Sequence, residues 1–122
     1  MVAAVGAIGF GCTSRATASD IVALIAGECG ELRAGMLLAT LDRRAGLAHA
    51  VARELALDVV TFDAAALARV SRTTVSSLRA VRSIGTPSVA EAAALAALGR
   101  GSRLVVTRRT GRGCTCARAE LA

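Results

Sequence analysis

The stretch IGTPSVAEAAALAALG, residues 84–99, contains the only proline of the chain and places Glu91 ahead of a run of alanine and leucine. Ser88 and Glu91 have the spacing of a capping box, in which each side chain accepts a hydrogen bond from the backbone N–H of the other residue. Pro87 disfavours helical backbone in the residue before it. The sequence therefore predicts a helix that begins after Ser88. Because residues 92–99 carry no charge, this helix should be buried on every side.

Strand-like and helix-like segments alternate before this helix, and that alternation is typical of an α/β domain. The expected strands are the apolar runs at 2–10, 36–41 and 57–62. Helices are expected at 18–27, after DRR (42–44), and at 63–70. Thr17 and Asp20 form a capping pair for the first of these, and Asp63 stands at the head of the last.

The remaining segments complete the expected fold. Residues 71–83 are rich in arginine and hydroxyl side chains and should form a loop with one turn of helix. Residues 102–109 and 113–119 are expected to form a hairpin joined around TGRG. We predict a single domain over residues 1–122. Its fold class is α/β, a three-layer α/β/α sandwich around a mostly parallel or mixed sheet of about five strands.

The only histidine is a poor candidate for catalysis. Leu47, Val51 and Leu55 recur every fourth residue and define the buried stripe of their helix. At about 100° per residue, His49 lies about 160° from the centre of that stripe, so it should point to solvent. No Ser-His-Asp or Cys-His arrangement is expected.

Composition restricts the possible partners. The 122 residues include fifteen basic residues, all arginine, against nine acids, and the net charge is +6. Such a surface favours anionic partners. With two phenylalanines and no tyrosine or tryptophan, the chain lacks stacking platforms for bases, which argues against nucleic acid. Arginine pairs well with the carboxylates or phosphates of a small polyanion.

Neither a membrane segment nor a metal site is expected. The longest uncharged runs, 1–14 and 92–99, are shorter than the roughly 20 apolar residues of a bilayer span. No basic residue precedes the first run, so we expect a soluble cytoplasmic protein rather than a secreted one. The cysteines match zinc spacing poorly and are expected to be buried thiols. They are Cys12, Cys29, Cys114 and Cys116.

Two segments next to expected strand ends are candidate ligand sites. In GFGC, Gly9 to Cys12, exposed amides could cradle an anion, although the third glycine of a dinucleotide fingerprint is missing and a plain tight turn is an equal alternative. Thr40, Asp42 and Arg44 follow the second strand, where ligands of open α/β sheets usually bind. A cap of the next helix is the alternative role for Asp42.

Four segments together resemble the CobE / CbiG C-terminal domain family of cobalamin biosynthesis. They are GFGC with TASDI, LATLDRR, GTPSVAEAAAL and CTCARA, in the order and spacing of that family. The third motif, residues 85–95, is the most specific and matches throughout. Arg44 stands where the family has a lysine, and Arg15 supplies a charge that the family places just after the first cysteine. Cys116 and Arg118 replace apolar residues of the last motif.

The resemblance implies a three-layer α/β/α domain of the stand-alone type, which binds or processes a polycarboxylate corrinoid (precorrin) intermediate. In the longer family proteins such a domain accompanies one that shares in opening a lactone, so this chain could act as a precorrin lactone hydrolase or a carbon–carbon cleaving accessory. Whether it is an enzyme stays open. No cofactor or metal is implied, and other cobalamin-pathway enzymes are possible partners.

The resemblance also implies which residues meet the corrinoid. Glu91 and Asp42 are the catalytic candidates. The substrate-binding candidates are Gly9, Gly11, Cys12, Arg15, Thr40, Arg44, Ser77, Ser88 and Thr115. A nucleotide or nucleic-acid binding module, suggested by the charge and the glycine pair, and a non-catalytic partner subunit of a pathway enzyme are the alternative functions.

Overall fold

The computed structural model describes residues 6–73 and 88–121. Its elements in chain order are β1 (Gly6–Cys12), α1 (Ala18–Glu28), β2 (Leu37–Leu41), the 3-10 turn η1 (Asp42–Arg44), α2 (Ala45–Leu55), β3 (Asp58–Phe62), α3 (Ala64–Thr73), α5 (Val89–Leu98), β4 (Ser102–Thr110) and β5 (Cys114–Leu121). The expected alternation of strands and helices is confirmed.

The five strands form one mixed sheet in the order β3-β2-β1-β5-β4. Strands β1, β2 and β3 are parallel, and β5 is antiparallel to both β1 and β4. Strand β4 therefore runs in the same direction as β1. As a result, the carboxyl ends of β1, β2, β3 and β4 and the start of β5 share one edge of the sheet, which we call the carboxyl edge.

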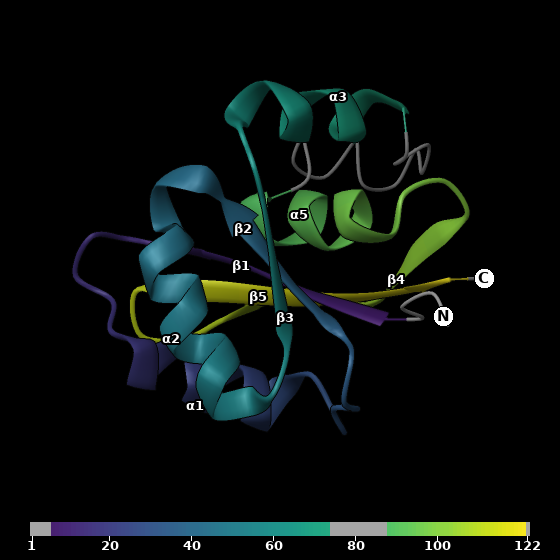
Figure 1. Cartoon of the computed structure of the whole chain (residues 1–122). Coiled ribbons are helices and arrows are strands. Elements are labelled where there is room, and N and C mark those ends of the chain that lie inside the picture. Colours follow the sequence, from purple (N-terminus) through teal and green to yellow (C-terminus); the bar gives the residue numbers. More distant parts are fainter. Residues whose placement is uncertain (1–5, 74–87, 122) are drawn as a thin grey trace.

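Helices cover both faces of this sheet, as the expected three-layer fold requires. Helices α1 and α2 pack on one face, α5 packs on the other, and α3 lies against α5 (Figure 1). The predicted fold class, an α/β sandwich around a mixed sheet, is confirmed.

The two faces of β1 carry side chains of different sizes. Ile8 and Phe10 point toward α1 and α2 and are fully buried in the larger core, whose other large members include Ile21, Ile25 and Leu38. The opposite face of the strand carries Ala7, Gly9 and Gly11. A Cβ atom at Gly9 would lie 2.0 Å from the carbonyl oxygen of Ala90 and 2.7 Å from the amide nitrogen of Ala94. The backbone of α5 therefore lies almost directly on β1.

Helix α5 forms as its capping box predicts. The amide of Glu91 donates to the Ser88 hydroxyl at 3.1 Å, and the Ser88 amide donates to the Glu91 carboxylate at 3.2 Å. Every residue from 90 to 95 is buried. Alanine suits these positions because it combines the highest helix propensity with a small side chain, which permits the close contact with β1.

Helix α1 has the second predicted capping box. The Thr17 amide donates to Asp20 Oδ2 at 3.0 Å, and the Asp20 amide donates to Thr17 Oγ1 at 3.1 Å. Asp63 likewise accepts the amide of Ala66 at 2.7 Å and begins α3, as predicted.

Replacing Asp20 with asparagine should make stability less sensitive to acid. The hydrogen bond from the Thr17 amide lowers the pKa of Asp20 in the folded protein. Asp20 therefore contributes stability above its unfolded pKa of about 3.9, and that contribution is lost as pH falls through the folded pKa. Asparagine keeps the acceptor without titrating. Urea midpoints measured from about pH 7 to about pH 2 should fall less steeply for Asp20→Asn than for the wild type, whereas parallel profiles would contradict this.

Three local expectations need correction, and a fourth lies outside the described residues. The segment GFGC is not a loop, because β1 continues to Cys12 and its glycines pair with neighbouring strands. The buried side of α2 is formed by Ala48, Val51 and Ala52, with Leu47 and Leu55 only partly buried at its margin. Helix α3 extends to Thr73, past the predicted end at residue 70. The rest of the expected loop, residues 74–83, lies outside the described part of the chain.

Other expectations hold. His49 lies on the exposed side of α2, as predicted. The two last strands form a hairpin around Gly111, whose amide donates to the carbonyl of Cys114 at 2.8 Å. Within residues 6–73 and 88–121, no helix is long and apolar enough to cross a bilayer.

Candidate functional site

Most of the candidate residues lie at the carboxyl edge, although they come from four different elements. Gly11 and Cys12 end β1, Asp42 and Arg44 lie in η1 directly after β2, and Thr115 is the second residue of β5. Ser88 and Glu91 also lie there, because α5 starts against the end of β1. A Cβ atom placed on Gly11 would lie 3.3 Å from Val89 Cβ.

Backbone carbonyls at the end of β1 hold two of the candidates in place. Arg44 Nη2 donates to the carbonyl of Cys12 at 3.2 Å, which fixes η1 against β1. Thr115 lies opposite Gly11 in the antiparallel register, and its hydroxyl donates to the Gly11 carbonyl at 3.5 Å. These two contacts fix η1 and the start of β5 against the end of β1. Arg44 is half-buried on the side of α2, and Thr115 lies on the side of α5.

Glu91 is the most extensively bonded candidate. Its side chain is buried, with 8% of the residue exposed. Oε1 accepts from the amide and hydroxyl of Ser88 at 3.2 and 3.4 Å, and Oε2 accepts from the amide of Arg108 in β4 at 3.0 Å. The carboxylate therefore caps α5 and also ties the start of α5 to β4. Because both oxygens already accept hydrogen bonds, Glu91 is held in place more firmly than a capping residue needs to be.

Thr40 and Gly9 face the interior rather than the edge. Thr40 is completely buried and its hydroxyl donates to the carbonyl of Phe10 at 2.8 Å. Gly9 lies beneath α5, as described above. Both residues shape the sheet under the site, so their part in the site is indirect.

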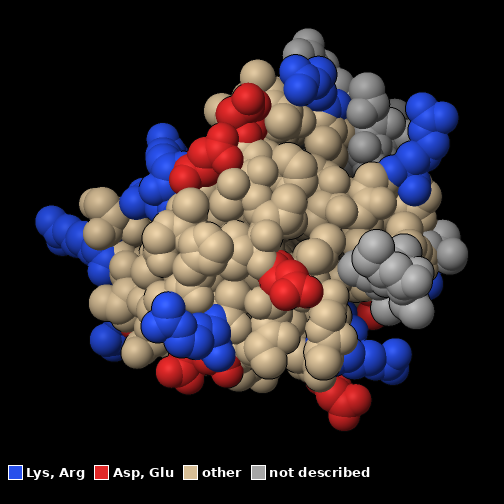
Figure 2. Space-filling model, in the orientation of Figure 1, with Lys and Arg blue, Asp and Glu red and all other residues tan. Residues whose placement is uncertain are grey.

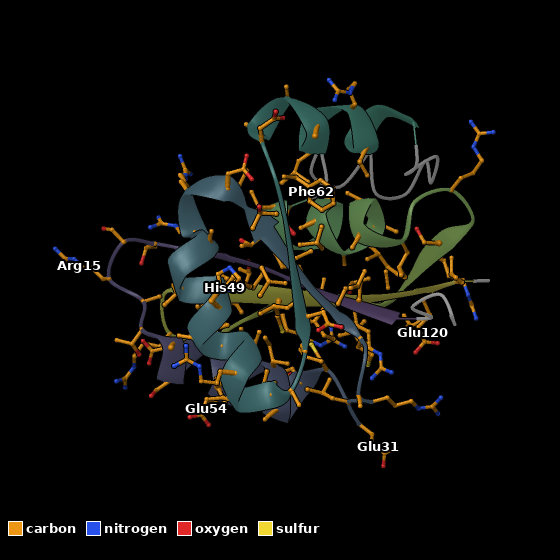
Figure 3. The ribbon with its side chains drawn as sticks, viewed as in Figure 1. Arg15, Glu31, His49, Glu54, Phe62 and Glu120 are labelled. Atoms are coloured by element: carbon orange, nitrogen blue, oxygen red, sulfur yellow. The ribbon has the colours of Figure 1, made fainter. Side chains whose placement is uncertain are left out.

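Asp42 and Arg15 project from the carboxyl edge. Asp42 is exposed, and its carboxylate has no hydrogen bond or ion pair within residues 6–73 and 88–121. It does not cap α2, since the residue that precedes this helix is Arg44 and makes no side-chain cap. Arg15 extends outward from the loop after β1 (Figure 3). Ser77 lies outside the described residues.

Positive charge is concentrated in the carboxy-terminal hairpin. Residues 100–121 contain six arginines and one acid, Glu120, and so supply five of the six net positive charges of the chain. Arg108, Arg109 and Arg112 lie at the carboxyl edge, near the turn between β4 and β5. Arg109 pairs with Glu28 at 3.5 Å. On the face shown in Figure 2, most of the basic side chains lie near the rim, and an acidic side chain lies near the centre.

Arg108 is a further candidate for the site, and the sequence analysis did not identify it. Its side chain is exposed, and its amide is bonded to the buried carboxylate of Glu91. The arginine doublet in TRRTGRG, just before a hairpin turn, was the available signal. The spacing of residues along the chain does not indicate that this doublet lies beside the start of α5, because that proximity arises from the packing of α5 on the sheet.

Chemistry at this edge favours binding of anions over nucleophilic attack. Burial raises the pKa of the Cys12 thiol, and the charges of Arg44 and Arg43 oppose this only in part. The thiol is therefore mostly protonated near neutral pH. His49 lies exposed on α2, and among the described residues no hydrogen bond joins it to a cysteine. Within the described ranges, no group of three or more potential ligands could hold a metal ion.

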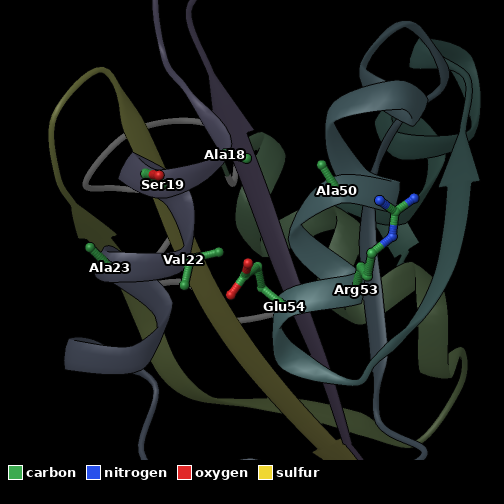
Figure 4. A pocket seen from close by; sticks show the side chains of 7 residues that line it. All are labelled: Ala18, Ser19, Val22, Ala23, Ala50, Arg53 and Glu54. Carbon is green, nitrogen blue, oxygen red and sulfur yellow. The ribbon is translucent and has the colours of Figure 1, made fainter.

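A separate cavity of about 400 Å³ lies between α1 and α2 (Figure 4). Its lining residues are Ala18, Ser19, Val22, Ala23, Ala50, Arg53 and Glu54. Glu54 points toward α1, whereas Arg53 points away from it (Figure 4). None of the candidate residues lines this cavity, so it does not belong to the carboxyl-edge site.

Comparisons with known proteins agree with the fold and with the sequence motifs. Residues 7–119 match the family model described as cobalamin synthesis G C-terminus. No curated protein sequence matches the chain. The crystal structure of cobalamin biosynthesis protein chiG from Agrobacterium tumefaciens is 32% identical, with a TM-score of 0.76, and the match covers 97% of this chain and 99% of that one.

A second solved structure is also similar. It is that of CobE, a protein from the cobalamin (vitamin B12) biosynthetic pathway. It is 30% identical with a TM-score of 0.74, and the match covers 99% of this chain and 93% of that one. The family match spans most of the sequence, and both structural matches extend over nearly the whole chain. This chain belongs to the CobE / CbiG C-terminal domain family of cobalamin biosynthesis proteins.

Proposed function

We propose that this protein binds a polycarboxylate corrinoid intermediate of cobalamin biosynthesis at the carboxyl edge of its sheet. The observation that carries the proposal is the accumulation of arginine at this edge in a member of a cobalamin-biosynthesis family. Arg44 follows β2, and Arg108 and Arg112 lie beside the hairpin turn. Corrinoid precursors carry several acetate and propionate carboxylates, and guanidinium groups bind carboxylates through paired, charge-assisted hydrogen bonds.

The described geometry supports binding more strongly than turnover. Both oxygens of Glu91 accept hydrogen bonds from the protein, so this carboxylate is poorly placed to move a proton. Asp42 is exposed and unpartnered within the described residues, which makes it the carboxylate available to act as a general base if a lactone is opened here. We propose that binding and transfer of the corrinoid is the main role and that any hydrolysis depends on Asp42.

Arg44→Ala and Arg108→Ala should each weaken corrinoid binding about tenfold, which corresponds to the loss of one charge-assisted contact of about 1.4 kcal/mol. The measurement is a visible-absorbance titration of the purified protein with hydrogenobyrinic acid. Arg53→Ala is the matched control, because Arg53 is exposed and lines the cavity between α1 and α2. This control should bind like the wild type.

Three results would argue against the proposal. If excess corrinoid leaves the spectrum unchanged on mixing with the wild type, the protein does not bind it. That result would favour the alternative that the protein is a non-catalytic partner subunit of a pathway enzyme. Equal weakening in all three variants would mean that net charge, rather than the carboxyl edge, attracts the ligand. Tight binding of a random DNA duplex with a steep salt dependence would favour the nucleic-acid alternative.

A further inference from the structure

The four cysteines lie along one face of the sheet, although the sequence scatters them between residues 12 and 116. Cys114 and Cys116 are two residues apart on β5 and so point to the same side, toward α1 and α2. Cys12 lies directly opposite Cys114 in the antiparallel register. Cys29, at the end of α1, reaches Cys116 from above the sheet.

Cys29 and Cys116 are in direct contact. Their sulfur atoms are 3.2 Å apart, and neither residue has any exposed surface. A sulfur–sulfur bond is about 2.0 Å long, so the two atoms need to approach by little more than an ångström. By contrast, no hydrogen bond between Cys12 and Cys114 occurs among the described residues, although their strands are paired there.

The surroundings of this pair hold Cys29 in position. Arg118 Nη1 donates to the carbonyls of Cys29 and Glu31, at 2.8 and 2.7 Å, and so fixes the end of α1 over β5. The hydrogen bond from Cys116 lowers the pKa of Cys29, and the charge of Arg118 acts in the same direction. The same hydrogen bond, together with burial, raises the pKa of Cys116. One thiol of the pair is therefore more easily ionised than the other.

We propose that Cys29 and Cys116 form an oxidation site that closes into an intramolecular disulfide between α1 and β5. With hydrogen peroxide, the sulfur of Cys29 attacks one peroxide oxygen, and a sulfenic acid and a water molecule result. The sulfur of Cys116 then attacks the sulfur of Cys29, and a second water molecule leaves. In total the two thiols lose two protons and two electrons, and the peroxide takes up both to give two water molecules.

Small oxidants can reach this site when the last turn of α1 opens. Cys29 is the C-cap of α1, and the following Gly30 adopts a left-handed conformation with φ of 74°. The connection onward to β2 contains mostly exposed residues. Helix ends and loops open at lower free energy than the core of a protein, so opening of this turn does not require global unfolding.

The test treats the purified, reduced protein with hydrogen peroxide or diamide, denatures it, blocks free thiols with an alkylating agent and maps the peptides by mass spectrometry. The expected product contains Cys29 linked to Cys116, with Cys12 and Cys114 alkylated. Because the bond closes a long loop of the unfolded chain, oxidation should raise Tm by on the order of 10 °C. Dithiothreitol should reverse this rise.

Two variants make the result specific. Cys29→Ala should abolish both the cross-linked peptide and the rise in Tm on oxidation. Cys12→Ala is the matched control, because it removes a cysteine of the same row but leaves the contacting pair, and it should oxidise like the wild type. If the wild type keeps four alkylated thiols, or if Cys12 is found linked to Cys114 or chains are linked to one another instead, the proposal is wrong.

Discussion

Gly9→Ala is expected to destabilise the protein by about 3 kcal/mol or more, because the added methyl group meets backbone rather than flexible side chains. The Cβ atom would lie 2.0 Å from the carbonyl oxygen of Ala90 and 2.7 Å from the amide nitrogen of Ala94. Helix α5 would have to move away from β1, and the buried alanines between them would lose contact. Urea unfolding of the purified variant, compared with the wild type, measures the loss.

Gly27→Ala is the control for this prediction. Gly27 lies in α1, and within the described part of the chain a Cβ atom placed there would have no atom within 4 Å apart from its neighbours and the backbone of its own helix. Alanine is favoured over glycine inside helices, so this variant should gain about 0.5–1 kcal/mol. A Gly9→Ala protein as stable as the wild type would show that α5 does not pack directly on β1.

Gly9 also has a role in the fold that the sequence alone could not predict. The capping box of α5 and the burial of its residues 90–95 could be predicted because they depend on neighbours along the helix, whereas residues 96–98 are only partly buried. The role of Gly9 could not, because it depends on contact with residues about eighty positions later. Local pattern ended the first strand at Phe10 and favoured a tight turn or a ligand loop at GFGC. The structure instead uses the glycines of this segment inside a strand, where they make room for a helix.

The candidate site likewise combines features that local sequence predicts with contacts between distant segments that it does not predict. The alternation of strands and helices, with polar residues after strand ends, was enough to predict that Asp42 and Arg44 lie at the carboxyl edge of the sheet. The hydrogen bond between Glu91 and the Arg108 amide was not predictable, since it joins a helix to the outermost strand of the sheet. The contact between Cys29 and Cys116 was not predictable for the same reason, because it joins two segments that are 87 residues apart in the sequence.

The position of Glu91 gives a test in which stability and binding should change together. Glu91→Ala removes the acceptor for the amides of Ser88 and Arg108, and the loss should be about 3 kcal/mol because two donors are left without their partner. Glu91→Gln should lose about 1–2 kcal/mol. Glutamine keeps one acceptor oxygen, but its NH₂ group must face one of the two amides from which the carboxylate accepts. Unfolding in urea at neutral pH measures both losses.

Ser88→Ala separates the two roles of this carboxylate. It removes the hydroxyl that accepts the Glu91 amide but leaves the bond between Glu91 and Arg108, so it should cost only about 1 kcal/mol. On the proposed function, Ser88→Ala should also keep corrinoid binding, whereas Glu91→Ala should weaken it, because Arg108 is no longer tied to the start of α5. If Ser88→Ala is as damaging as Glu91→Ala in both measurements, capping alone explains Glu91, and its link to β4 contributes nothing to the site.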